Sequence, residues 1–239
     1  MTNSAQGSPY PGLIIAVDGP AGSGKSSAAR GVARALGLRY LDTGAMYRAL
    51  TWSLLHSGAD LSRPDVIAEL APRTVIEVGT DPDAPTIRVD GTDVAGPIRT
   101  REVSNAVSAV ASVPDVRRRL ITQQQQIIAT AVADGHGIVA EGRDIGTVVA
   151  PDAPVKVYLT ASEAVRALRR NADPAGGQAG TVQQTQAEQA RRDHRDSAQL
   201  AKAPGAVEID STGIGLAEVI GEIVSLATNR TAGAAWTTT

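Results

Sequence analysis

Cysteine and phenylalanine are absent from this chain of 239 residues, and aromatic residues make up only 3% of it. Without cysteine the chain has no disulfide, no iron–sulfur cluster and no zinc site with thiolate ligands. Its three histidines, His56, His136 and His194, argue against a histidine-rich metal site. The core must therefore be aliphatic, and the 42% of hydrophobic residues supply it mainly as alanine, valine, leucine and isoleucine.

Neither sign of charge dominates, because 23 basic residues stand against 25 acidic ones, for a net charge of −2. This balance argues against a protein that coats nucleic acid or binds anionic membranes. No run of about 18 apolar residues is present, so we expect no transmembrane helix. Residues 1–12 lack the basic-then-apolar pattern of a signal peptide. We expect a cytoplasmic protein of one compact domain with no nucleic-acid or membrane partner.

Short apolar runs that end in glycine or polar residues indicate strands buried on both faces, as in a parallel sheet. The runs are Leu13–Val17, Leu38–Leu41, Ile138–Ala140, Val155–Leu159 and Val207–Ile209. Segments with apolar residues at helical spacing lie between them, the first from Ala28 to Leu36. This alternation predicts an α/β fold in which helices wrap a parallel sheet.

Residues 61–96 interrupt the alternation and predict an inserted subdomain. Ser62-Arg-Pro-Asp65 has the pattern of a capping box that starts a short helix. Thr74–Val78 and Thr86–Val89 are β-like, and Asp90-Gly91 is typical of a tight turn. We therefore expect two or three short antiparallel strands over Ala71–Gly96.

Three other segments are expected to be exposed. Asn171–Glu188 is rich in glycine, glutamine, alanine and threonine and has no steady apolar face, which predicts a mobile segment. Residues 1–12 and 228–239 are small, polar and without periodicity, so we expect mobile tails. By contrast, Ser112-Val-Pro-Asp115 and Ser162 are expected to begin helices.

The segment from Gly19 to Ser26 fits the phosphate-binding loop, with a strand before it and a helix after it. Its glycines let successive backbone N–H groups point at phosphate oxygens, and the following helix adds its positive dipole end. Lys25 supplies a cation for the outer phosphates of a nucleoside triphosphate, and the Ser26 hydroxyl can ligate Mg²⁺. The expected ATP-binding residues are Gly19, Pro20, Ala21, Gly22, Ser23, Gly24, Lys25, Ser26 and Ser27.

The loop indicates a nucleoside triphosphate but not a particular reaction. No Asn-Lys-x-Asp motif is present to read guanine, and the chain is short for a motor or a large ATPase. A small α/β chain with an insert and an arginine-bearing segment suits a small-molecule kinase, which has to cover its substrates to exclude water. A nucleotide-dependent switch without catalysis is the alternative of another class.

Two motifs follow predicted strands and should lie beside the phosphate loop, because ligands bind at the carboxyl ends of strands in an open α/β sheet. They are Asp42-Thr-Gly-Ala-Met-Tyr47-Arg48 and Glu141-Gly-Arg143-Asp144. Arg48 and Arg143 can bind a second phosphate bidentately, which leaves Asp144 to read a polar edge. Taken alone, Arg48 is as well explained as an exposed helix charge, and Arg143 as a partner of Asp144 or Glu141.

Basic residues also stand at both ends of the segment that is expected to be mobile. Arg191–Ser197 follows it, and Arg166, Arg169 and Arg170 precede it. A lid that folds over ATP needs such cations to offset charge on the transferring phosphoryl group. The alternative is a solvated charge run, and we expect His194 to be solvated rather than to act as a base.

Five motifs together resemble those of the bacterial cytidylate kinases. They are Val17-Asp-Gly-Pro-Ala-Gly-Ser-Gly-Lys-Ser, Leu41-Asp-Thr-Gly-Ala-Met-Tyr-Arg, Ile98-Arg-Thr, Glu141-Gly-Arg-Asp-Ile-Gly-Thr-Val-Val and Arg192-Asp-His-Arg-Asp-Ser, in order over residues 13–226. The second and fourth are far more specific than the phosphate loop.

The resemblance implies the three-layer P-loop kinase fold of the nucleoside monophosphate kinases. That fold has a five-stranded parallel sheet, an inserted monophosphate-binding subdomain and a mobile lid. On this pattern residues 13–60, 97–170 and 198–227 form the core, residues 61–96 the insert and residues 171–197 the lid.

The resemblance also implies ATP with Mg²⁺ as donor, CMP or dCMP as acceptor, and a monomer. Lys25, Arg143 and Arg192 are the implied catalytic residues, and Ser26 is the implied Mg²⁺ ligand. The implied substrate-binding residues are Thr43, Tyr47, Arg48, Ser108, Arg117, Arg143, Asp144, Arg192 and Asp196. A kinase for another small acceptor, such as a different nucleotide, stays open.

Among these residues, Ser108, Arg117 and Asp144 are implied to read cytosine. The exocyclic amino group of cytosine can donate to Asp144 and Ser108, and its ring can accept from Arg117. Uracil presents a carbonyl in place of the amino group, and a site built for a hydrogen bond rejects the wrong partner strongly. Without the resemblance, Ser108 is a helix-surface hydroxyl and Arg117 a salt-bridge partner.

One position departs from the family pattern. There, an arginine that helps to hold CMP stands one residue after Arg-Asp-x-x-Asp-Ser, whereas this chain has Gln199 and a shorter connection through Lys202. Glutamine cannot make the bidentate phosphate contact of a guanidinium. We expect weakened acceptor binding and a donor site that is little affected, with Lys202 or Arg195 as replacement cations.

Overall fold

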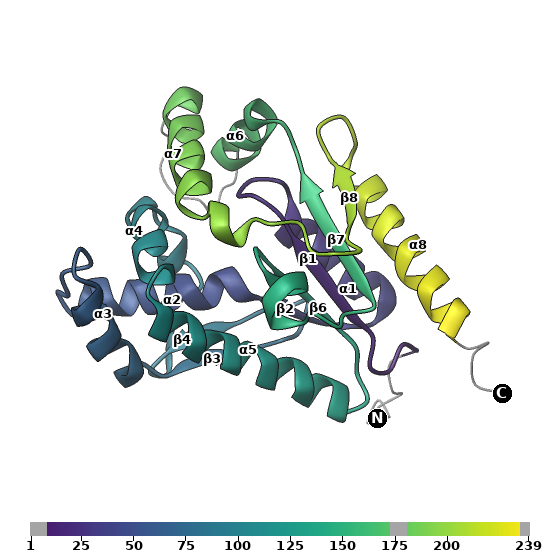
Figure 1. The fold of residues 1–239 in the computed structure, drawn as a ribbon, viewed down its shortest axis with the longest axis horizontal. Coiled ribbons are helices and arrows are strands. Elements are labelled where there is room, and N and C mark those ends of the chain that lie inside the picture. The colour runs from purple at the N-terminus through teal and green to yellow at the C-terminus, as the bar shows by residue number, and fades with distance from the viewer. Residues whose placement is uncertain (1–8, 173–180, 235–239) are drawn as a thin grey trace.

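A five-stranded parallel sheet forms the middle layer of the molecule (Figure 1). The computed structural model describes residues 9–172 and 181–234. The strand order is β2-β6-β1-β7-β8, so the strand before the phosphate loop lies at the centre. Its strands are β1 (Ile14–Asp18), β2 (Arg39–Asp42), β6 (Ile138–Gly142), β7 (Val155–Thr160) and β8 (Val207–Asp210). The parallel sheet expected from the apolar runs is confirmed.

Helices cover both faces of the sheet, and each face has its own buried cluster. On one face, Ile15 and Val17 of β1 pack with α1 (Lys25–Leu36) and α8 (Leu216–Ala234). On the other, Ala16 packs with α2 (Thr43–His56) and α5 (Pro114–Ala133). Successive residues of a strand point to opposite faces, so a continuous apolar run fills both clusters.

The insert contains a second, antiparallel sheet in the order β3-β4-β5. Its elements are α3 (Pro64–Leu70), a short 3₁₀ turn η1 (Ala71–Arg73), β3 (Ile76–Val78), β4 (Ile87–Val89) and β5 (Thr92–Asp93). Asp90 and Gly91 have φ values of 49° and 78° and make the expected turn. Ile76 and Ile87 belong to the same buried cluster as α2 and α5, so the small sheet has no separate core.

Two helix starts differ from the expected capping pattern. The N-cap of α3 is Arg63, and the Ser62 hydroxyl donates instead to Asp60 Oδ1. The N-cap of α5 is Val113, and Ser112 donates to the Ala109 carbonyl of α4 (Arg101–Ala111). In both helices proline stands at the first position, where its missing N–H costs nothing and its fixed φ suits the helix. Ser162 does cap α6 (Glu163–Asn171), as expected.

Two segments expected to lack structure contain helix. Residues 182–188 lie in α7 (Val182–Arg195), which begins with a capping box made by Thr181 and Gln184. Residues 228–234 continue α8, where Thr228 and Thr231 donate to carbonyls one turn earlier. Local hydrogen bonds and capping therefore form helix where the apolar pattern is weak. Residues 1–8, 173–180 and 235–239 of the expected tails and mobile segment lie outside the described residues.

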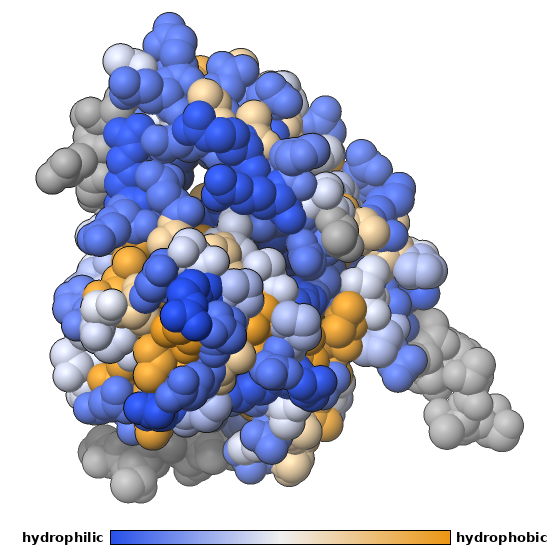
Figure 2. Space-filling model, turned by 60° about the vertical axis from the view of Figure 1, so that its left-hand side comes forward, coloured by the Kyte–Doolittle hydropathy of each residue, from blue (hydrophilic) through white to orange (hydrophobic). Residues whose placement is uncertain are grey.

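Three short turns complete the described chain: η2 (Pro97–Arg99), a π-helical turn η3 (Ile145–Val149) and η5 (Ser197–Gln199). None of the helices within residues 9–172 and 181–234 has the length and apolar character needed to cross a bilayer. Figure 2 shows that the upper part of one face is strongly hydrophilic, that apolar residues gather below it, and that the surface is hollowed between the two.

Candidate active site

The phosphate loop joins the end of β1 to the start of α1, as the sequence predicts. Two of its glycines are required by their surroundings. Gly19 has φ 145°, and a Cβ there would lie 2.0 Å from the Leu159 carbonyl oxygen. Gly22 has φ 80°, and a Cβ there would lie 2.8 Å from the Arg166 carbonyl oxygen. Only glycine lets the loop pass this close to β7 and α6.

Lys25 and Ser26 stand at the first turn of α1 and face the end of β6. The Lys25 ammonium donates to the Pro20 carbonyl at 2.7 Å, across the loop that it closes. The Ser26 hydroxyl donates to Glu141 Oε1 at 2.5 Å, and the Tyr40 hydroxyl donates to the same oxygen at 3.1 Å. Glu141 thus contacts the helix that follows the phosphate loop, a contact that the sequence does not predict.

Burial shifts the pKa values of this group of side chains. It raises the pKa of Glu141 to about 7, and the nearby charge of Asp42 adds to the effect. It lowers the pKa of Lys25 to about 8, although the Glu141 carboxylate opposes that shift. Both groups therefore titrate close to neutral pH, which is common at functional sites.

Asp18 connects the phosphate loop to the segment after β6. Its two carboxylate oxygens accept hydrogen bonds from the backbone N–H groups of Ile145 and Gly146, each at 2.8 Å. These residues open the turn η3, directly after Arg143 and Asp144. Asp18 therefore positions that segment. The signal for this contact in the sequence is an acidic residue, Asp18, at the end of an otherwise apolar strand.

Arginines from three helices, the turn η2 and one strand end surround a cavity of about 200 Å³ beside the phosphate loop. Arg48 of α2 and Arg170 of α6 both donate to the Ser104 hydroxyl of α4, at 2.8 and 3.2 Å. Arg143, after β6, pairs with Asp196 at 3.0 Å and approaches Asp193 at 3.6 Å. The structure thus brings Arg48 and Arg143 together, and neither Asp144 nor Glu141 is the ion-pair partner of Arg143.

The cations of this cavity destabilise one another. Burial lowers the pKa of Arg48 to about 10, with a contribution from Arg170. Burial also lowers the pKa of Arg192 on α7 well below its usual value, and Arg48 and Arg143 add to the effect. Nη1 of Arg143 and Nε of Arg192 are buried without a hydrogen-bond partner among the described residues. A phosphate in the cavity would satisfy these donors and relieve the repulsion.

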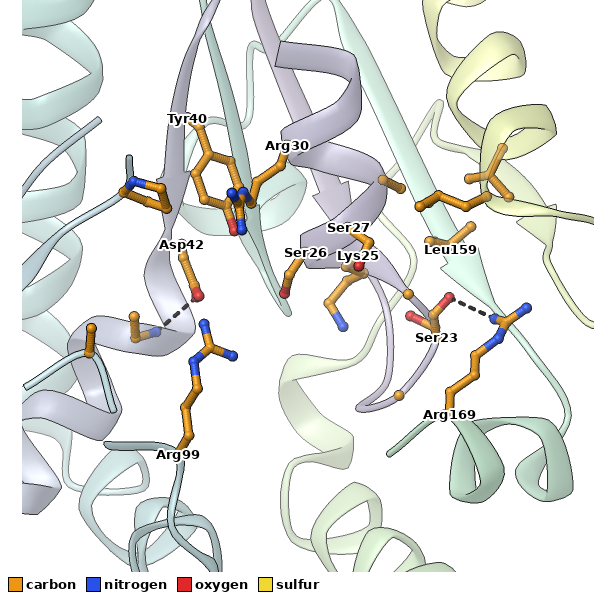
Figure 3. Close-up of a pocket in the computed structure, with 18 of the residues that line it drawn as sticks. Ser23, Lys25, Ser26, Ser27, Arg30, Tyr40, Asp42, Arg99, Leu159 and Arg169 are labelled. Atoms are coloured by element: carbon orange, nitrogen blue, oxygen red, sulfur yellow. Dashed lines mark hydrogen bonds between the residues drawn. The ribbon is translucent and has the colours of Figure 1, made fainter. Parts of the chain in front are cut away.

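A larger cavity, of about 980 Å³, adjoins the first along the phosphate loop (Figure 3). Its lining includes Ser23, Lys25 and Ser27 of the loop and its helix, and Ile214 and Gly215 before α8. Figure 3 shows Lys25 and Ser26 between Asp42 on one side and Ser23 with Arg169 on the other. The two cavities share Gly22, Lys25 and Ser26, so a donor and an acceptor can meet at Lys25.

Comparison with known proteins decides the family. The family model described as "Cytidylate kinase" matches residues 15–229, which is most of the chain. The chain belongs to the cytidylate kinase family.

Curated relatives agree with that assignment. The chain is 51% identical over 220 residues to the cytidylate kinase of Streptomyces avermitilis, covering 90% of this chain and 93% of that protein. It is 46% identical over 230 residues to the cytidylate kinase of Mycobacterium leprae, covering 94% and 99%. A solved gluconokinase from Sinorhizobium meliloti shares the fold at TM-score 0.53 and 16% identity, covering 96% of this chain and 99% of the other. The protein is therefore a kinase rather than a switch without catalysis.

Of the three residues that the cytidylate kinase pattern assigns to the base, two are in contact with each other. Arg117 on α5 donates from Nη2 to Asp144 Oδ2, and Asp144 is buried. Ser108 is buried on α4. Within the described residues, Ser108 has no side-chain hydrogen bond to either partner, so the three groups do not form one closed network without a ligand.

Thr43 and Tyr47 lie on the first turns of α2, next to β6. The Thr43 hydroxyl is buried and donates to the Glu141 carbonyl at 2.8 Å, so it anchors α2 to the strand. Burial raises the pKa of Tyr47 to about 12, which keeps its hydroxyl protonated. Asp196 is buried at the end of α7, 3.6 Å from Arg192 and 3.0 Å from Arg143.

The three arginines expected to act as cations at the root of the lid lie on α6 and bind the phosphate loop or α4. Arg166 is buried and donates to the Ala21 carbonyl at 3.1 Å and to Asp193 at 2.5 Å. Arg169 donates to the Ser23 carbonyl at 3.3 Å and to Ser211 at 2.7 Å. These two guanidiniums therefore fix the loop from the side of α6. His194 is exposed on α7, as expected.

Proposed function

We propose that this member of the cytidylate kinase family transfers the terminal phosphoryl group of ATP to CMP and dCMP by direct in-line displacement. The observation that supports it best is the pair of adjoining cavities that share Lys25. One cavity runs along the phosphate loop, and the other is lined by Arg48, Arg143 and Arg192. A kinase needs two phosphate sites in contact, with water excluded between them.

On this proposal the residues from Gly19 to Ser27 bind the donor. Backbone N–H groups and the start of α1 hold the inner phosphates, and Lys25 reaches the outer ones. Ser26 and Glu141 present a hydroxyl and a carboxylate 2.5 Å apart, a set of hard oxygens that suits Mg²⁺. When bound, Mg²⁺ would neutralise charge on the donor phosphates.

In the transfer step, an oxygen of the CMP phosphate attacks the γ-phosphorus of ATP. A new P–O bond forms as the bond to the β-phosphate oxygen breaks, and ADP leaves with that electron pair. Lys25, Arg143 and Arg192 stabilise the charge on the transferring group, because phosphoryl transfer depends mainly on positioning and electrostatics. Arg48, Thr43 and Tyr47 hold the acceptor end.

We further propose that Ser108, Arg117 and Asp144 select cytosine. Cytosine would insert its amino group against the Asp144 carboxylate and the Ser108 hydroxyl, and Arg117 would donate to the ring. Uracil would leave a carbonyl facing a carboxylate in a buried site, which is costly. Asp196 would accept a hydrogen bond from a ribose hydroxyl, and Arg192 would contact the ribose beside it. We also propose that the protein is cytoplasmic and monomeric. Sedimentation of the purified protein tests whether it is a monomer.

An ADP-release assay across CMP, dCMP, UMP and AMP tests the proposal. We expect CMP and dCMP to be the preferred acceptors and UMP to be used less well. If AMP is phosphorylated faster than CMP, the protein is a kinase for another acceptor and the assignment of Ser108, Arg117 and Asp144 is wrong. Asp144→Asn should reduce the preference for CMP over UMP more than it reduces ATP binding.

A further inference from the structure

The motif Ile98-Arg-Thr has no role in the function proposed above, although it belongs to the pattern of the chain. It lies in η2, between the small sheet and α4. Ile98 is buried, and its N–H donates to the Val94 carbonyl at 3.0 Å. Arg48 donates to the Ile98 carbonyl at 3.4 Å. The backbone that presents Arg99 is therefore anchored on both sides.

The Arg99 side chain is half-buried and reaches the junction of the two cavities. It lines both the larger and the smaller cavity, which few other charged residues do. Figure 3 shows its guanidinium pointing up from η2 toward Asp42 and Lys25. No described residue makes a hydrogen bond or an ion pair with that guanidinium. Its five donors are thus available to a ligand.

The charges around the smaller cavity do not balance. Six basic residues line it: Lys25, Arg48, Arg99, Arg143, Arg170 and Arg192. Three acidic residues line it, and each is already engaged. Asp42 caps the Ala45 N–H, Glu141 accepts from Ser26 and Tyr40, and Glu188 pairs with Arg101. An unpaired, half-buried guanidinium at such a place is stabilised by an anion from outside the chain.

We propose that Arg99 binds the terminal phosphate of the triphosphate donor, where that phosphate faces the acceptor. This assignment rests on the proposed phosphoryl transfer. Arg99 would contact the γ-phosphate and not the β-phosphate, because it approaches Lys25 from the side of the acceptor cavity. Arg99 lies in η2, directly after the insert. It would therefore bind the phosphoryl donor from the side of the molecule where the acceptor binds.

Titration calorimetry with ATP and with ADP, in the absence of any acceptor, tests the assignment in Arg99→Gln. We expect the Kd for ATP to rise about 10-fold or more, as for loss of a charge-assisted contact. The Kd for ADP should stay within about 3-fold, since ADP lacks the contacted phosphate. The Kd of Arg99→Lys for ATP should lie between those of the wild type and Arg99→Gln, because lysine keeps the charge but cannot make the bidentate contact of a guanidinium.

Arg88→Gln is the matched control, because Arg88 lies on β4 of the insert that precedes η2, is exposed and lines neither cavity. The proposal is overturned if Arg99→Gln binds ATP as the wild type does, if it weakens ATP and ADP equally, or if Arg88→Gln has the same effect. A purely structural role would lower Tm without separating the two nucleotides. The test does not involve CMP, so a failure of the acceptor assignment leaves its outcome readable.

Discussion

At the scale of single residues, the phosphate loop and the arginines beyond it were predictable, because each belongs to a short local pattern. The loop pattern places Lys25 and Ser26, and the two strand-end motifs place Arg48 and Arg143. The contacts of Glu141 and Asp18 were not predictable, since they depend on which strands are neighbours. Only the order β2-β6-β1 puts Glu141 beside Ser26.

Removal of the Lys25 ammonium should affect catalysis more than acceptor binding. Lys25→Ala removes the phosphate-loop cation that lines both cavities, so we expect kcat to fall about 100-fold or more, as for loss of one preorganised charge. The KM for CMP should change little by comparison. Steady-state kinetics measure both, and a near-normal kcat would remove Lys25 from the mechanism.

The rate should depend on pH through Glu141 and Lys25. As pH falls through about 7, Glu141 gains a proton and Ser26 loses an ionised acceptor. As pH rises through about 8, Lys25 loses the proton that makes it a cation. We therefore expect a bell-shaped profile of kcat/KM for ATP with its maximum between these values.

Glu141→Gln separates this effect from titration of the substrates, whose phosphates also gain a proton near pH 6. The acidic limb of the profile should move or disappear in the variant. If it stays in place, the phosphates of the substrates cause it and Glu141 does not control the rate.

Gln199 should limit acceptor affinity. It lies in η5, directly after Asp196, whose carbonyl accepts its backbone N–H at 2.9 Å. Lys202, the suggested replacement cation, is half-exposed and pairs with Glu208 at 3.1 Å. We expect Gln199→Arg to lower the KM for CMP, at most by about 10- to 100-fold, and to leave the KM for ATP unchanged. If Lys202→Ala raises the KM for CMP while Gln199→Arg does nothing, Lys202 supplies the contact instead.

At the scale of elements, strands and strongly periodic helices were predictable from local patterns, and their partners were not. The apolar runs match all five strands of the large sheet to within a residue or two. The helix α7 was missed, because its only buried residue within the described ranges is Gln189 and its apolar stripe is weak. Contacts with α6 and α4, rather than periodicity, give this helix its place.

The insert and α7 are each held by a polar contact that ligands should reinforce. Asp83 pairs with Arg34 of α1 at 2.7 Å, and Glu188 of α7 pairs with Arg101 of α4 at 2.5 Å. Exposed pairs of this kind contribute little on their own. We expect amide hydrogen exchange over residues 79–86 and 182–195 to be fast in the free protein and to slow down with ADP and CMP.

Glu188→Gln supplies the comparison, since it removes the charge of one of these pairs and keeps a side chain of the same size. Exchange in α7 should be faster in the variant without ligands, and that over residues 79–86 should not change. Equal protection of both segments with and without ligands would argue against closure on the substrates.

At the scale of the whole molecule, the insert should unfold together with the core, because it shares one buried cluster with α2 and α5. This could not be predicted from the sequence, which marks residues 61–96 only by a change of pattern. Ile76→Ala in β3 should cost about 2–5 kcal/mol of unfolding free energy, whereas Val75→Ala, at a side chain that is 57% exposed, should cost under about 0.5 kcal/mol.

Two probes test whether the insert and the core unfold together. The Trp236→Phe background leaves Trp52 as the one tryptophan of the chain. Trp52 packs on the shared cluster and reports on the insert side, while far-UV circular dichroism reports on the whole fold. Ile76→Ala should lower the transition midpoint equally by both probes. Separate midpoints would mean that the insert unfolds on its own.

The carboxylate of Asp18 has a consequence for attempts to redesign this enzyme. It stands immediately before the donor loop and holds the backbone that follows Arg143 and Asp144. A new acceptor pocket built by exchanging residues 143–149 would keep its register only if two consecutive N–H groups remained to meet this carboxylate. A proline at either position would remove one of these two N–H groups and leave one oxygen of a buried carboxylate without its donor. Residues 143–149 can thus be exchanged as one segment to change the acceptor preference only when the first turn of η3 is retained.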